Sequence, residues 1–133
     1  MNAFADNFSS QLRSTLLDFA GRVRAVNPAL VCDFGSSKND VFLLRVYLSL
    51  SMRGDGEEVA VTVDVMVTAD VLNIVSDVCQ DSGQVIAVGP SAAIPWNGEQ
   101  PTQNDALTIW LREFNRFLSD SESKVVEITS TLL

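Results

Sequence analysis

The feature that most constrains the fold is a run of valines at every second position between residues 59 and 67. Successive side chains of a β-strand point to opposite faces of the sheet, so this alternation predicts a strand over Glu58–Thr68 with one apolar face. Thr62 and Asp64 fall on the other face. An apolar strand face has to be buried, so the chain needs a second layer of structure to cover it.

Four other segments carry strand signals, either period-two alternation or short apolar, β-branched runs bounded by turns: Leu30–Phe34, Val41–Ser51, Val71–Cys79 and Gln84–Val88. Gly54-Asp55-Gly56 and Asp81-Ser82-Gly83 supply the turn residues that hairpins require. The short connections predict an antiparallel meander of four to five strands.

Helical periodicity brackets these strands. Apolar residues at three- and four-residue steps predict a helix over Asp6–Ala25, which Pro28 ends. A second helix is expected after a loop over Gly89–Asn104, capped by Thr102 or Asn104. Ser119–Ser123 is expected to interrupt it before a final turn or two. Its predicted apolar stripe is Leu107, Trp110, Leu111, Phe114, Phe117 and Leu118.

The order of these segments predicts a single α+β domain spanning residues 1–133. Each helix offers one apolar stripe, and the long strands offer one apolar face. We therefore expect the N-terminal and C-terminal helices to pack on the same face of the sheet, leaving the opposite face more exposed to solvent.

Residue types that carry chemistry are scarce. The 133 residues include no histidine, and the two cysteines, Cys32 and Cys79, match no metal or redox spacing. Both are expected to be buried thiols, with a disulfide as the alternative. No phosphate-binding loop occurs, Gly54–Glu58 lacks the ligand spacing of a calcium loop, and nothing fixes Asp64 and Asp77 as a catalytic pair. We expect no enzymatic activity, no cofactor and no metal.

Charge indicates which partners suit the chain. The net charge is −8, which disfavours contact with nucleic acid. The first residues, Met1–Asp6, lack the pattern of a signal peptide, and no apolar run is long enough for a membrane span. These observations predict a soluble, cytoplasmic protein.

The excess of acids is confined to residues 30–105, which contain eleven acidic and three basic residues. One interpretation is that turns favour aspartate and that strands need charge on their open side. The other is a negative surface for a basic partner, because aspartate is uncommon within strands such as that of Asp64. The residues predicted to bind this partner are Tyr47, Asp64, Asp70, Asn73, Asp77 and Trp96. Alternatively, Tyr47 only shields the sheet and Trp96 only fastens its loop to the core.

The whole-chain architecture, with a sheet from Phe42-Leu43-Leu44-Arg45-Val46-Tyr47 to Asp64 and a closing helix around Trp110-Leu111-Arg112-Glu113-Phe114, resembles the immunity proteins of bacterial toxin systems, including contact-dependent growth inhibition. That resemblance implies a monomer that binds and neutralises a basic toxin domain. The chain is also similar in length and acidity to type III secretion chaperones, which implies a homodimer that binds an effector. Those chaperones usually place a helix between the third and fourth strands, whereas Ala69–Cys79 here predicts strand.

Overall fold

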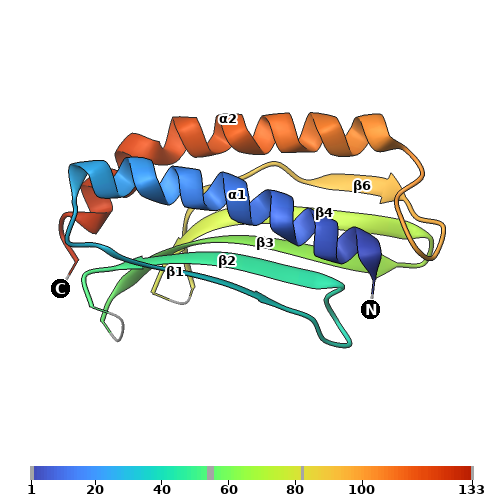
Figure 1. Cartoon of the computed structure of the whole chain (residues 1–133), viewed down its shortest axis with the longest axis horizontal. Coiled ribbons are helices and arrows are strands. Elements are labelled where there is room, and N and C mark those ends of the chain that lie inside the picture. The colour runs from blue at the N-terminus through green and yellow to red at the C-terminus, as the bar shows by residue number, and fades with distance from the viewer. Residues whose placement is uncertain (1, 54–55, 82, 133) are drawn as a thin grey trace.

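In the computed structural model, which describes residues 2–53, 56–81 and 83–132, two helices lie along one face of an antiparallel sheet (Figure 1). The sheet is formed by β1 (Val31–Ser37), β2 (Leu44–Ser51), β3 (Glu58–Thr68), β4 (Val71–Gln80), β5 (Gln84–Val88) and β6 (Ala92–Pro95). The first five strands are neighbours in sequence order. β5 and β6 both pair with β4, β5 along its C-terminal part and β6 along its N-terminal part. The helices are α1 (Ala3–Val26) and α2 (Asn104–Thr129). The predicted α+β fold is confirmed.

The alternation of valines determines which face of the sheet is buried. Val59, Val61, Val63 and Val65 of β3 are completely buried, and β2 and β4 add alternate apolar residues to the same layer. The fifth valine, Val67, lies near the end of β3 and is 37% exposed. One apolar face of the meander thus forms the core together with the apolar stripes of α1 and α2.

Both helices differ from their predicted limits for local reasons. α1 begins before Asp6 because the side chain of Asn2 accepts a hydrogen bond from the Ala5 amide at 2.9 Å and caps the helix. The cap position of α2 is Gln103, which makes no side-chain cap hydrogen bond, and the Thr102 hydroxyl instead donates to the Pro95 carbonyl. The cap prediction for Thr102 or Asn104 was therefore wrong.

The predicted interruption at Ser119–Ser123 was also wrong, because α2 is continuous through these residues. Ser121 lies on the buried stripe between Leu118 and Val125, so a small polar residue occupies a core-facing position without breaking the helix. Glu122 forms an ion pair with Arg22 of α1, in which Arg22 Nε lies 2.6 Å from Glu122 Oε1. Glu122 thus takes part in a contact between the two helices, within a helix that continues to Thr129.

The structure corrects several of the predicted strands. β1 continues to Ser37 instead of ending at Phe34, and β6 lies within the predicted loop Gly89–Asn104. β2 begins at Leu44 rather than Val41, because the Asn39 side chain accepts hydrogen bonds from the Val41 and Phe42 amides, both at 2.8 Å. The predicted limits of β3 and β5 are confirmed.

The turns between strands are short. Ala69 and Asp70 join β3 to β4, with Ala69 in the left-handed region at φ 55°. Asp81, which begins the next turn, has φ 46°. The predicted turn residues Gly54, Asp55 and Ser82 lie outside the described residues. Among the helices that the structure describes, none is long and apolar enough to cross a membrane.

Gly89, at the end of β5, is a position where we expect substitution to destabilise the fold. Its amide donates to the Ser76 carbonyl at 2.9 Å, and an added Cβ would overlap Ser76 Oγ and lie 2.8 Å from the Phe117 ring. We expect Gly89→Ala to lower the free energy of unfolding by about 1–3 kcal/mol, because the Ser76 hydroxyl is itself bonded to Pro90.

Urea denaturation of Gly89→Ala measures this effect. Gly21→Ala is the matched control, since an added Cβ at that helical position meets no atom within 4 Å. We expect the control to be stabilising by about 0.5–1 kcal/mol, because alanine is a better helix former than glycine. Equal stability of Gly89→Ala and the parent protein would contradict the packing argument.

Candidate functional site

The face of the sheet opposite the helices, which we call the open face, carries the polar side chains of the long strands. Strand register places Tyr47, Thr62 and Asp77 in one row across β2, β3 and β4. Arg45, Asp64 and Val75 form the next row. This register also places Tyr47, Asp64, Met66, Asn73 and Asp77 on the same side of the sheet.

A shallow depression of about 450 Å³ lies on the open face. Small side chains form part of its lining, and charged residues lie toward both ends. The lining residues are Arg45, Tyr47, Ser49, Glu58, Ala60, Thr62, Asp64, Asp77, Cys79, Asp81 and Gly83. We call this depression the acidic groove, because four of these residues are carboxylates and Arg45 is the sole cation among them.

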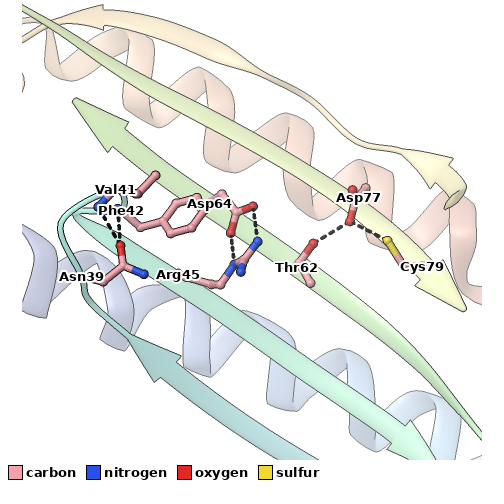
Figure 2. Close-up of polar contacts among 8 residues, drawn as sticks. All are labelled: Asn39, Val41, Phe42, Arg45, Thr62, Asp64, Asp77 and Cys79. Carbon is pink, nitrogen blue, oxygen red and sulfur yellow. Dashed lines mark hydrogen bonds and ion pairs between the residues drawn. The ribbon is translucent and has the colours of Figure 1, made fainter. Parts of the chain in front are cut away.

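At one end of the acidic groove, Arg45 is held in place from two sides (Figure 2). Its Nε donates to Asp64 Oδ1 at 2.7 Å and its Nη2 to Asp64 Oδ2 at 3.1 Å. The guanidinium carbon also lies 4.4 Å from the centre of the Phe42 ring. The hydrogen bond that Arg45 donates to Asp64 raises the pKa of Arg45. This pair neutralises the charge of Asp64 and accounts for an aspartate in the middle of a strand.

Asp77, in the middle of the groove, has neutral partners. Its Oδ1 accepts a hydrogen bond from Thr62 Oγ1 at 2.5 Å and one from Cys79 Sγ at 3.1 Å (Figure 2). Neither donor carries a positive charge, so the hydrogen bonds orient the carboxylate without neutralising it. Asp77 therefore adds negative potential to the groove.

Glu58 and Asp81 lie at the opposite end of the groove from the Arg45–Asp64 pair. The Ser49 hydroxyl donates to Glu58 Oε2, and the Glu58 amide donates to Asp81 Oδ1 at 3.1 Å. These contacts also involve neutral donors. The uncompensated negative charge of the groove thus lies around Glu58, Asp77 and Asp81.

The aromatic side chain of Tyr47 lines the acidic groove together with these carboxylates. Its ring lies over Gly35 of β1, where an added Cβ would overlap the ring carbons and the hydroxyl. A glycine at position 35 lets the ring lie against the neighbouring strand, and the tyrosine is still 40% exposed. The structure therefore presents Tyr47 on the open face while also letting it shield the sheet.

The other predicted partner-binding residues lie outside the groove. Asn73 shares the open face, where its Nδ2 contacts the Val71 carbonyl at 3.4 Å, and Asp70 lies in the β3–β4 turn. Trp96 is only 8% exposed, packs edge-on against Phe4 and donates its amide to the Asp70 carbonyl. The interpretation that Trp96 fastens its segment to the core is the one that its burial supports, and the indole does not belong to the open face.

Sequence reasoning did not select Arg45, Glu58, Thr62 and Asp81 as site residues. The available signal was strand alternation, since Arg45 shares its parity with Tyr47, and Glu58 and Thr62 share theirs with Asp64. Asp81 gave no such signal, because its position depends on the turn after β4.

The two cysteines are free thiols, each half-buried. Cys32 lies on the helix-covered side of β1 and Cys79 on the open face of β4, so the sheet separates them. Burial raises the pKa of Cys32, and burial together with the Asp77 hydrogen bond raises the pKa of Cys79 to about 11. The disulfide alternative is therefore not realised.

We expect Cys79 to be alkylated slowly by iodoacetamide at pH 8, because the thiolate is the reactive form. A pKa raised from 9.0 to about 11 lowers the thiolate fraction about a hundredfold relative to an unperturbed thiol. The rate is expected to keep rising above pH 9, as measured by mass spectrometry against the urea-unfolded chain. A rate that reaches its plateau by pH 9 in the folded protein would contradict this expectation.

No group of three or more His, Cys, Asp or Glu residues suited to a metal ion occurs in the regions described by the structure. Compared with known proteins, the chain matches no family model, no curated protein and no solved structure.

Proposed function

We propose that this protein is an immunity protein that binds a basic toxin domain on its open face and so neutralises it. The observation that supports the proposal is the acidic groove, in which Arg45 is the one cation of the lining and forms its ion pair with Asp64 rather than with Glu58, Asp77 or Asp81. A surface of this kind attracts a cationic partner and accelerates its association.

Apolar contacts on the same face add to the support for a protein partner. Tyr47, Val75, Val85 and Val88 are all at least 40% exposed and belong to β2, β4 and β5. Protein interfaces combine such aromatic and aliphatic contacts with a charged rim. Under this proposal Tyr47 supplies affinity, and the carboxylates supply orientation and speed of association.

The alternative of a type III secretion chaperone receives less support. Its usual helix between the third and fourth strands has no counterpart here, because Ala69 and Asp70 join β3 directly to β4. We accordingly propose a monomer that acts in the cytoplasm and forms a one-to-one complex with the toxin, without turnover of a substrate.

The proposal predicts that the gene directly upstream encodes a toxin, and it is tested by coexpression with the toxin domain of that gene product. We expect the protein to restore growth and to form a one-to-one complex by light scattering. Continued growth arrest in the presence of the folded protein, or a stable homodimer that leaves the toxin active, would overturn the proposal.

A further inference from the structure

A second surface lies at the edge of the sheet formed by β1. This seven-residue strand pairs with β2 on one side, and within the described ranges no strand pairs with its other side. It contains no proline, and its pairing with β2 is uninterrupted. The opposite edge is built differently: β5 and β6 have five and four residues, a register shift interrupts the pairing at Val78/Cys79, and β6 ends at Pro95. Short strands, irregular pairing and prolines are the devices that protect sheet edges, and β1 lacks them.

A groove of about 420 Å³, which we call the α1 groove, runs beside β1 on the helix-covered side of the sheet. It is lined mainly by apolar or small residues of α1, by Pro28 and by Cys32 of β1. The α1 residues are Leu17, Ala20, Gly21, Arg24 and Ala25. Arg22, which pairs with Glu122 of α2, is not among the lining residues, whereas Cys32 of β1 is. The groove therefore opens toward the free edge of β1.

The charge beside this edge is opposite in sign to that of the acidic groove. Arg13 lies 5.5 Å from the centre of the Phe34 ring of β1, and Arg24 lines the α1 groove. The ion pairs that the structure shows among described residues involve Arg22, Lys38 and Arg45, and neither Arg13 nor Arg24 takes part in one. The helix-covered side of the β1 edge is therefore basic, although the chain as a whole has a net charge of −8.

We propose that β1 binds an extended segment of a partner protein, which adds to the sheet as a further strand. Main-chain hydrogen bonds to β1 supply affinity, and alternate side chains of the segment supply specificity. Of the side chains of the bound segment, one set faces the helices. This set includes an apolar residue that enters the α1 groove and an acidic residue that lies beside Arg13 or Arg24. The other set faces Asp33 on the open side and is basic or polar.

A second copy of this chain fits the site less well than such a segment. Antiparallel pairing of two β1 strands about Phe34 would place Ser36 of the second copy opposite Cys32, so the small serine would leave the α1 groove unfilled. It would also bring Arg13 of both copies to the same pair of Phe34 rings. Like charges at the centre of the contact oppose dimerisation, as does the net charge of −8 on each chain.

The test uses the blocked peptide Ac-Thr-Leu-Lys-Asp-Thr-Leu-Lys-Asp-NH2. Its leucines and aspartates alternate with threonines and lysines, and its net charge is zero, so binding does not arise from bulk attraction to an acidic protein. Titration is followed by amide chemical shifts of the ¹⁵N-labelled full chain. We expect saturable shifts confined to β1 and the Leu17–Ala25 part of α1, together with slower hydrogen exchange of β1 amides. A matched peptide that is N-methylated at its two central residues loses an N–H on each edge and is expected not to bind.

Two protein variants distinguish the groove from a general apolar surface. Leu17→Asp is expected to weaken peptide binding about tenfold or more, because it places a charge where an apolar side chain docks. Ile109→Asp on α2 is the matched control: Ile109 is 51% exposed and Leu17 40%, so both variants are expected to stay folded. Arg24→Glu is expected to favour the peptide in which lysine replaces each aspartate.

Three outcomes would overturn the strand-addition proposal. They are the absence of saturable shifts, equal binding of the N-methylated peptide, and self-association of the free protein through β1. The site is separate from the open face, so these outcomes leave the proposed toxin binding untouched. Conversely, failure of toxin neutralisation would leave peptide binding at β1 intact.

Discussion

Replacing Trp110 by alanine is expected to lower the free energy of unfolding by about 3–5 kcal/mol, the range for removing a large aromatic side chain from a core. Trp110 is 1% exposed, stacks on Phe114 with ring centres 4.9 Å apart, and meets Phe8 edge-on at 5.8 Å. Its Nε1 donates to the Pro90 carbonyl at 3.0 Å. The side chain therefore joins α2, α1 and the segment between β5 and β6.

Thermal and urea denaturation measure this loss, and two variants separate its causes. Trp110→Phe keeps an aromatic ring but removes the hydrogen bond to Pro90, so a smaller loss of about 1–3 kcal/mol is expected. Ile109→Ala, at the neighbouring exposed position, is expected to change stability by less than about 0.5 kcal/mol. Similar stabilities for Trp110→Ala and Ile109→Ala would show that the aromatic cluster does not hold the helices to the sheet.

Charge reversal of the acidic groove is expected to have the largest effect on the proposed function. In the double variant Glu58→Lys with Asp77→Lys, two of the uncompensated carboxylates become cations. We expect the rate of association with the toxin domain to fall by about tenfold or more at low salt, because steering of a cationic partner is lost. In the parent protein the rate is expected to fall as salt rises, since the screening length is only about 8 Å at physiological ionic strength.

The matched control is Glu113→Lys with Asp120→Lys, which changes the net charge equally at two exposed positions of α2. Stopped-flow association and growth protection are the measurements, with circular dichroism to verify folding. If the groove variant and the α2 variant slow association equally, the effect comes from net charge. In that case the open face is not the toxin-binding surface.

Asp64 is a less informative position than its place in the strand suggests. Its carboxylate already holds Arg45, and its side chain is only 17% exposed. Lysine at position 64 would place a second cation next to Arg45 and remove the carboxylate that holds it. The Phe42 ring would remain beside Arg45. A change in binding would then mix lost steering with local rearrangement, so Glu58 and Asp77 give the clearer experiment.

The sequence by itself determined the elements whose pattern is local. The alternating valines of β3 defined a strand, its buried face and the opposite side, on which Asp64 lies. The apolar stripes defined two helices, because burial of a stripe is the main source of helix stability in a protein. Backbone geometry alone relates these patterns to faces, so no long-range contact was needed.

The tertiary structure decided what depends on contacts distant in sequence. β6 is a strand because it pairs with β4, and β1 extends through Gly35–Ser37 because these residues pair with β2. Ser119–Ser123 stays helical because Ser121 packs in the core and Glu122 pairs with Arg22. The acidic groove and the α1 groove likewise arise between elements, since a surface shared by separate strands and helices exists only once these have packed together.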